Sequence, residues 1–248
     1  MTVIIAMAGA GSGFRSRGYL VPKHMILARG KTLFEWSLES LRPFFDHHFI
    51  FACLLEHDGL WVEAQARAMG IKYVTVVKRR AISLGQAHTV HDVLNRAVPN
   101  DPIWIYSIDT YIRRGLAPCC LLGHQGCVPV FKSIDPGMSF VRYDEDGEVI
   151  ELAEKNVISN WATVGLYGFQ SASLYRELYQ QSYCNGIVSE AHGERYVAPM
   201  YQLLLQAGMS ISAPQLNGGD VHVLGSPAEV LAFDSNCMPP FGSQTPSG

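Results

Sequence analysis

The sequence predicts an α/β fold in which a mixed, mainly parallel central sheet lies between two layers of helices. β-Prone runs alternate with helical patterns through the first half of the chain, whereas hairpin signals appear only after Gly126. The 248 residues, 48% of them hydrophobic and 17% charged, can supply the core of one domain of ordinary size.

The first predicted elements are a buried strand, a long loop and a helix. Val3 to Met7 is a continuous β-prone run, and glycines recur from Gly9 to Gly18. Helical spacing of apolar residues begins only at Leu33 to Leu41. The segment after the strand is therefore expected to stay a loop through Gly18, with no helix starting before that residue.

The same alternation continues through the first half of the chain. The predicted strands are Phe49 to Leu55, Tyr73 to Val77 and Ile103 to Ile108, and the predicted helices are Leu60 to Met69 and Ala87 to Val98. A largely parallel sheet of this kind collects its ligands beyond the carboxyl ends of its strands.

The second half of the chain looks antiparallel. Strands are predicted at Val128 to Phe131, Ser139 to Tyr143 and Val149 to Leu152, with a hairpin turn at Asp144 to Gly147, and helices at Ser171 to Gln181 and Ala198 to Ala207. We expect a single domain over residues 1–238, with halves at about 1–115 and 116–238, and a flexible Pro-, Gly- and Ser-rich tail at 239–248.

The bulk properties exclude several classes of partner. A formal net charge of -3 gives no field for nucleic acid, and the apolar first eleven residues are too short and glycine-rich to span a membrane. Six cysteines without a CxxC pair, and no secretory signal, favour free thiols in the cytoplasm. A monomer and a homo-oligomer are both compatible with the sequence.

The glycine-rich loop is the first candidate binding site. Gly9, Gly11 and Gly13 let backbone amides approach a triphosphate, and Arg15 and Lys23 could neutralise its charge. Such a loop is equally typical of a tight turn. No Walker lysine follows it, and the dinucleotide fingerprint does not fit a loop that runs to Gly18.

The longer phrase MAGAGSGFRSRGYLVPKHMI resembles the signature of the sugar-1-phosphate nucleotidyltransferases, also called nucleotide-sugar pyrophosphorylases. Further segments resemble that family in the same order along the chain: Gly85-Gln86-Ala87, Ile105 to Asp109, Glu154-Lys155, Gly165 to Phe169 and Leu224 to Glu229. The resemblance covers Val3 to Phe233, is nearest to short capsule-biosynthesis-type members, and implies a Rossmann-like, GT-A-like nucleotidyltransferase fold.

The resemblance implies Mg²⁺-dependent transfer of a nucleoside monophosphate from a nucleoside triphosphate to a sugar 1-phosphate or similar phosphorylated acceptor, with release of pyrophosphate. The product would be a nucleotide sugar for capsule or another surface polysaccharide. Neither the base nor the acceptor is defined, so a cytidylyltransferase acting on a non-sugar phosphate, or a catalytically weak nucleotide-binding homologue, stays open. A glycosyltransferase is disfavoured because Asp109-Thr110-Tyr111 is not an Asp-x-Asp motif.

The resemblance assigns roles to individual residues. Asp109, at the end of a buried strand, is also a hard oxygen ligand suited to Mg²⁺ on chemical grounds. The expected catalytic residues are Arg15, Lys23 and Asp109; the nucleotide-binding residues are Ala8, Gly9, Gly11, Ser12, Gly13, Gly85, Gln86, Ala87 and Ser107; the acceptor-binding residues are Glu154, Lys155, Gly165, Glu194 and Tyr196; and the metal ligands are Asp109 and Asp220.

The sequence departs from the family pattern at two positions. Gly13 stands where the family has an arginine that grips the leaving pyrophosphate, so Arg15 or Arg17 is expected to replace it. Val223 stands where the family often has a second metal carboxylate, which makes Asp220 or His222 the candidate substitute.

Overall fold

The computed structural model describes residues 1–9, 11–188 and 193–237. The expected flexible tail at 239–248 lies outside the described residues. Within the described part, no helix has both the length and the apolar character needed to cross a membrane.

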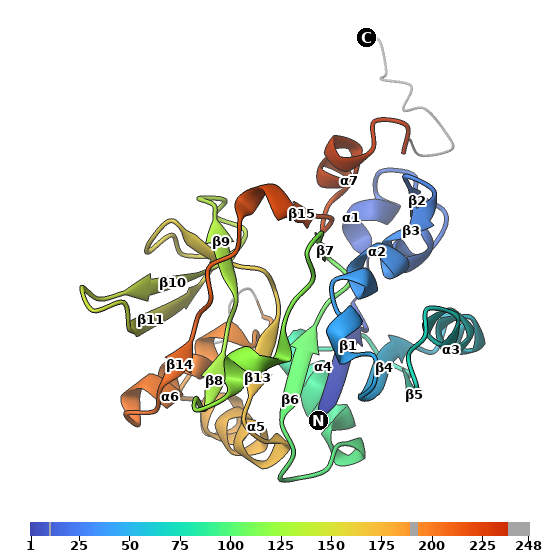
Figure 1. The fold of residues 1–248 in the computed structure, drawn as a ribbon. Coiled ribbons are helices and arrows are strands. Elements are labelled where there is room, and N and C mark those ends of the chain that lie inside the picture. Colours follow the sequence, from blue (N-terminus) through green and yellow to red (C-terminus); the bar gives the residue numbers. More distant parts are fainter. Residues whose placement is uncertain (10, 189–192, 238–248) are drawn as a thin grey trace.

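A seven-stranded sheet forms the centre of the molecule (Figure 1). Its strand order is β14-β8-β13-β6-β1-β4-β5, with β1 at Thr2–Met7, β4 at His48–Leu54, β5 at Tyr73–Arg79, β6 at Ile103–Tyr106, β8 at Gly126–Cys127, β13 at Tyr167–Phe169 and β14 at Ile211–Ser212. Strands β6, β1, β4 and β5 are parallel, whereas β13 runs antiparallel to both β6 and β8. The predicted mixed, mainly parallel sheet is confirmed.

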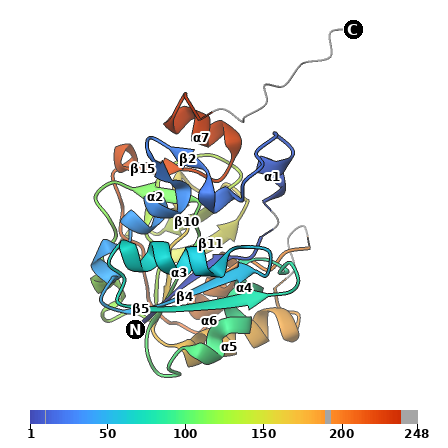
Figure 2. The ribbon, with the colours of Figure 1, turned by 90° about the vertical axis from the view of Figure 1, so that its right-hand side faces the viewer.

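Alternating side chains of β1 face two different cores. Val3 and Ile5 belong to the core that contains Phe34 and Val62, whereas Ile4 belongs to the core that contains Val90 and Tyr175. Helices α2 (Leu33–Glu39) and α3 (Gly59–Ala68) therefore cover one face, and α4 (Gln86–Val93), α5 (Ala172–Tyr179) and α6 (Tyr201–Gln206) the other. Figure 2 shows α3 above β4 and β5, with α5 and α6 below them.

A second, four-stranded antiparallel sheet flanks the first. Its order is β11-β10-β12-β9, with β9 at Val130–Lys132, β10 at Ser139–Tyr143, β11 at Val149–Glu154 and β12 at Trp161–Thr163. The predicted hairpin is confirmed, because β10 pairs with β11 and the amide of Asp144 donates to Glu148 O at 2.9 Å. A further pair, β7 (Thr110–Ile112) and β15 (Val221–Val223), brings the late part of the chain beside the end of β6.

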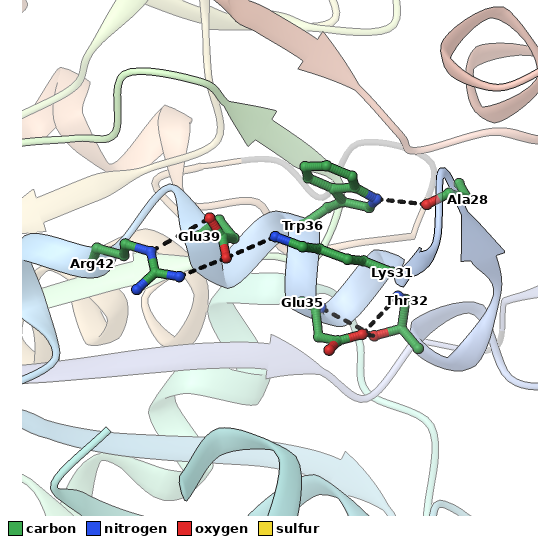
Figure 3. A network of polar contacts seen from close by, with 7 residues as sticks. All are labelled: Ala28, Lys31, Thr32, Glu35, Trp36, Glu39 and Arg42. Atoms are coloured by element: carbon green, nitrogen blue, oxygen red, sulfur yellow. Dashed lines mark hydrogen bonds and ion pairs between the residues drawn. The ribbon is translucent and has the colours of Figure 1, made fainter. Parts of the chain in front are cut away.

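Helix α2 anchors the segment that follows the glycine-rich loop (Figure 3). Thr32 and Glu35 form a capping box that fixes the start of the helix, and Trp36 Nε1 donates to Ala28 O at 2.7 Å. Ala28 lies in the hairpin of β2 (Leu27–Ala28) and β3 (Lys31–Thr32), which comes directly after the 3₁₀ turn Lys23–Met25. The capped helix thus holds the chain on which Lys23 is carried.

The glycine-rich loop contains a helix that the sequence analysis did not expect. Helix α1 spans Ser12–Arg15, so the prediction that no helix starts before Gly18 was wrong. Gly11 adopts φ 60°, and its carbonyl accepts hydrogen bonds from the amides of Phe14 and Arg15 at 3.2 Å. Glycine reaches this left-handed conformation without the strain of a Cβ, so the chain can turn directly into a short helix.

The last described helix, α7 (Pro227–Phe233), begins with a capping box between Ser226 and Glu229. It packs with Phe14, Tyr19 and Leu33 in a third apolar cluster. Figure 1 accordingly shows α7 beside the β2–β3 hairpin.

Candidate active site

A cavity of about 750 Å³ opens beyond the carboxyl ends of β1 and β6. One side is formed by the residues that follow these strands, and the other by the antiparallel sheet, through Phe131, Ser139 and Thr163. Fifteen expected site residues line it: Ala8, Gly9, Gly11, Ser12, Gly13, Arg15, Lys23, Gly85, Gln86, Ser107, Asp109, Glu154, Gly165, Glu194 and Tyr196. Ala87, Lys155 and Asp220 are not among its lining residues.

The glycine-rich loop presents open backbone to this cavity. A Cβ added at Gly9, Gly11 or Gly13 would meet no described atom within 4 Å. Of these three glycines, only Gly11 has a positive φ. Gly13 therefore has a backbone conformation that other residues can adopt, and there is room for a side chain. The loop therefore leaves space for a ligand at its amides, and Gly13 is not required by the fold.

Lys23 and Asp109 meet at the centre of the site. Lys23 Nζ donates to Asp109 Oδ1 and, at 3.3 Å, to Gly225 O. The lysine side chain is 15% exposed and the aspartate 47%, so the carboxylate is the partner that faces open space. The amide of Leu224 also donates to Asp109 O at 2.6 Å, which ties the end of β6 to the segment before α7.

Asp109 fits one part of a magnesium site. Mg²⁺ is commonly held by one or two carboxylates together with substrate phosphates, and Asp109 offers such an oxygen at the cavity wall. Across residues 1–9, 11–188 and 193–237, no three His, Cys, Asp or Glu side chains gather into a metal-binding group. The described residues thus hold no complete protein cage for a metal ion, and Asp109 is suited to share an ion with bound phosphates.

Asp220 is engaged elsewhere. It lies in the 3₁₀ turn Gly218–Asp220, is 3% exposed, and accepts from Arg113 Nε at 2.8 Å and Nη2 at 2.5 Å. Arg114 Nε lies 3.0 Å from its other oxygen. Both of its oxygens are paired with arginines, and Asp220 does not line the cavity. Its position therefore does not suit the expected role of second metal ligand. The other candidate, His222, stacks on Tyr111 with ring centroids 5.6 Å apart and does not line the cavity.

Arg15 is the arginine that reaches the cavity wall. Its Nη2 lies 2.6 Å from Glu56 Oε1, and both side chains are more than half exposed. Arg17, the alternative replacement for the missing loop arginine, is not a lining residue. Arg15 can leave an exposed ion pair at little cost, because such pairs contribute little to stability.

The second expected nucleotide loop packs against the segment that carries Glu194 and Tyr196. Gly85 adopts φ 107° and ψ 177°, and a Cβ there would lie 2.6 Å from Arg195 O. Arg195 N donates to Leu84 O at 2.6 Å, and Ala87 N donates to Arg195 O at 3.0 Å. The side chain of Ala87 is fully buried, so Ala87 contributes to this junction through its backbone amide.

Glu154 carries a partly buried carboxyl group at the cavity wall. It lies opposite Ser139 in the β10–β11 pairing, and Ser139 Oγ donates to its Oε2 at 2.5 Å. Burial raises the pKa of Glu154, the hydrogen bond from Ser139 opposes the shift, and the charge of Glu194 adds to it. Glu154 thus presents a polar carboxyl group to the cavity from an otherwise sheltered position.

Lys155 takes part in a network at the cavity rim. Its Nζ donates to Tyr196 OH at 2.5 Å, and that hydroxyl donates to Glu194 Oε2. Burial raises the pKa of Tyr196, and the hydrogen bond to Glu194 adds to the rise, so the hydroxyl stays protonated. Lys155 adopts φ 51°, a conformation that L-residues rarely take and that often occurs at functional sites.

Two histidines of the cavity wall were not expected from the sequence. His24 and His57 are 2% and 7% exposed. Burial lowers the pKa of His24, the nearby His57 adds to the shift, and the resulting value is about 4. The two residues lie in different loops, 33 positions apart in the printed sequence, so no local motif could have joined them.

Comparison with known proteins gives the family. No protein-family model and no curated protein sequence matches the chain. Among solved structures, a nucleoside-diphosphate-sugar pyrophosphorylase from Vibrio cholerae RC9 is 32% identical, matches over 93% of this chain and 98% of its own, and superposes with a TM-score of 0.85.

Two more distant structures share the fold. An inositol-1-phosphate CTP transferase from T. maritima is 18% identical, over 95% of each chain, with a TM-score of 0.72. A putative glucose-1-phosphate thymidylyltransferase from Bacillus anthracis, solved with a sucrose, is 16% identical, over 98% of this chain and 97% of its own, with a TM-score of 0.75.

The fold and the site define a nucleotidyltransferase of the Rossmann-like α/β class. The chain belongs to the sugar-1-phosphate nucleotidyltransferase family, also called the nucleotide-sugar pyrophosphorylases. The family resemblance and the enzyme class expected from the sequence are thereby confirmed.

Proposed function

We propose that this protein transfers a nucleoside monophosphate from a nucleoside triphosphate to a sugar 1-phosphate or similar phosphorylated acceptor and releases pyrophosphate. The observation that carries the proposal is one cavity that joins the open glycine-rich loop, the Lys23–Asp109 pair and the partly buried carboxyl group of Glu154. The name of the Vibrio cholerae relative supports the same reaction class.

The reaction requires negative charge to be gathered and neutralised. A phosphate oxygen of the acceptor attacks the α-phosphorus of the triphosphate, the bond to the β-phosphate oxygen breaks, and pyrophosphate leaves with the electron pair. The loop amides of Gly11 to Gly13 would bind the triphosphate, and Arg15 and Lys23 would offset its charge. Mg²⁺ held through Asp109 would supply further positive charge to the phosphate oxygens.

Lys23 is suited to move its charge onto the substrates. Its ammonium group already lies at the cavity wall, held by Asp109 and Gly225 and set in place by Pro22. Phosphate oxygens and a metal ion would divide this pair, the lysine turning to phosphate and the aspartate to the ion. The pairing thus keeps both charged groups in position before substrates arrive.

The acceptor is proposed to bind at the opposite end of the cavity. Glu154 would accept hydrogen bonds from its polar body, and Lys155 would bind its phosphate, after exchanging Tyr196 for that partner. Gly165, with φ 79°, would let the acceptor approach the backbone beside Ser107. We also propose that the enzyme works in the cytoplasm and supplies an activated sugar for capsule or another surface polysaccharide.

Gly13 favours a second candidate, a homologue that binds nucleotide and turns over slowly. The family arginine is missing there, and Arg15 lies in an ion pair with Glu56. A cytidylyltransferase with a non-sugar acceptor uses the same chemistry and differs only in the occupant of the Glu154 end.

One experiment separates these candidates. Purified protein is incubated with each of CTP, UTP, GTP, dTTP and ATP against a panel of sugar 1-phosphates and non-sugar phosphate monoesters, and pyrophosphate release is measured with Mg²⁺ and with EDTA. Release with a sugar 1-phosphate supports the proposal, and release only with a non-sugar phosphate supports the cytidylyltransferase. Tight nucleotide binding by calorimetry without release from any pair supports the slow homologue.

A further inference from the structure

His57 and His24 form an edge-to-face pair in the cavity wall. Their ring centroids lie 4.8 Å apart at 67°, and Trp61 lies 5.5 Å from His24 on α3. His57 belongs to the loop between β4 and α3, whereas His24 belongs to the 3₁₀ turn Lys23–Met25. Neither residue has a part in the proposed chemistry so far.

The backbone fixes the ring of His57 in one tautomer. The amide of Leu54 donates to His57 Nδ1 at 3.3 Å, and the amide of His57 donates to Leu54 O at 3.0 Å. Because Nδ1 accepts a hydrogen bond, the single hydrogen of the neutral ring is on Nε2. Burial lowers the pKa of His57, so the ring is neutral near pH 7. The group offered by His57 is thus an oriented Nε2–H donor on a ring whose other nitrogen is turned to the backbone.

The position of His57 places this donor next to the glycine-rich loop. Strands β1 and β4 are parallel neighbours in which Met7 pairs with Cys53, so the loops that follow them leave the sheet side by side. The ion pair between Arg15 and Glu56, the residue before His57, joins the same two loops. His57 and the glycine-rich loop also line the same cavity, so a donor on the His57 ring is available to a ligand bound there.

His24 completes the wall behind His57. It is 2% exposed, and its Nε2 has no hydrogen-bond partner in the described part of the chain. Its contacts are instead the rings of His57 and Trp61, so it acts by packing. Its chain neighbour is Lys23, the residue proposed to neutralise phosphate charge, so the packed histidines adjoin that residue.

We propose that His57 is a further nucleotide-binding residue, whose Nε2–H donates to a non-bridging oxygen of the β- or γ-phosphate, and that His24 is a positioning residue that holds the His57 ring. The assignment rests on the proposed function. It supplies a donor to the same cavity that Gly13 lines, where the sequence lacks the family arginine.

Two substitutions of His57 separate the donor from the ring. His57→Phe keeps a planar ring and removes both nitrogens, whereas His57→Gln places an amide N–H near the position of Nε2. The affinities for a nucleoside triphosphate and for the matching monophosphate are measured by calorimetry, with thermal unfolding of the free proteins as the check on folding. We expect His57→Phe to weaken triphosphate binding about 10-fold and monophosphate binding hardly at all, and His57→Gln to retain most of the affinity.

A double variant tests the positioning role. If His24 acts through His57, His24→Ala weakens triphosphate binding in the wild-type background and adds little in the His57→Phe background. Full additivity would overturn that role.

The remaining outcomes are equally decisive. Unchanged triphosphate affinity in His57→Phe, or an equal loss for triphosphate and monophosphate, would overturn the His57 assignment and leave the proposed function standing. A wild-type protein that binds no triphosphate would overturn both.

Discussion

Replacing Gly85 with alanine tests the junction between the second nucleotide loop and the segment that carries Glu194 and Tyr196. The φ of 107° and ψ of 177° lie in a region that is nearly restricted to glycine and costs other residues about 1–3 kcal/mol. The new Cβ would also lie 2.6 Å from Arg195 O and 2.7 Å from Arg195 N, and backbone atoms cannot swing aside as a flexible side chain would.

The clash at Arg195 also costs hydrogen bonds, in addition to the backbone strain at Gly85. Moving Arg195 away disturbs its bonds with Leu84 O and Ala87 N, each of which contributes about 1 kcal/mol. Together with the strain, the Gly85→Ala variant is expected to lose about 3–5 kcal/mol of unfolding free energy. This is a large fraction of the stability of an ordinary domain.

Urea unfolding followed by circular dichroism measures the effect, and Gly13→Ala is the matched control. Gly13 undergoes the same chemical change, but its Cβ meets no described atom within 4 Å and its φ is not positive. Its stability is expected to stay unchanged or to rise by up to about 1 kcal/mol. Equal unfolding midpoints for the two variants would refute the reasoning about the Gly85 junction.

The other predictions concern the charged groups of the site. Asp109→Asn is expected to lower Mg²⁺-dependent pyrophosphate release about 100-fold or more at saturating nucleotide, because the metal ligand is lost. Glu154→Gln is expected to raise the KM for the acceptor substrate about 10-fold with nucleotide affinity unchanged, because a carboxylate that accepts hydrogen bonds is replaced by a neutral amide. Gly13→Arg is expected to raise kcat/KM about 10-fold, because the position is open and regains a guanidinium. For His24, the folded pKa of about 4 lies below the ordinary 6.5, so the unfolded state binds more protons between these values. The unfolding free energy should therefore be fully retained above pH 6.5 and fall by up to about 3 kcal/mol as the pH drops through 4, an effect that His24→Leu removes.

Each of these expectations has a contrary result. Normal Mg²⁺-dependent turnover in Asp109→Asn would exclude its role as a metal ligand, and a change in nucleotide affinity in Glu154→Gln would exclude a purely acceptor-side role. Gly13→Arg without any gain would show that the chain already supplies the missing charge. Identical pH profiles for wild type and His24→Leu would mean that His24 is not the titrating group.

The long elements were predictable because their signals are local. The continuous apolar runs of β1 and β4 and the helical pattern of α3 each extend over six residues or more, and all three elements are predicted within a few residues of their observed bounds. The strands of two or three residues carry no such period. No strand is predicted at Tyr167–Phe169, which belongs to a segment that resembles the family, yet it forms the antiparallel strand β13 next to β6.

Site residues were predictable where a motif places them and unpredictable where a distant partner decides. The glycine-rich loop and Glu154 line the cavity, and both were identified from short sequence motifs. Asp220 is a candidate metal ligand by sequence, but Arg113, 107 positions earlier in the chain, pairs with its carboxylate. His57 has no motif at all, because its orientation comes from a backbone turn at Leu54.

The contact of Lys23 with Gly225 has a consequence for how the protein is made. The two residues are 202 positions apart, and Tyr19 OH likewise donates to Cys237 O across 218 positions. A chain leaving the ribosome exposes the glycine-rich loop more than 200 residues before the segments that secure it. Nascent chains that stop short of Gly225 therefore carry the complete glycine-rich motif without these contacts, and a ligand of the proposed site would stabilise the protein only after they have formed.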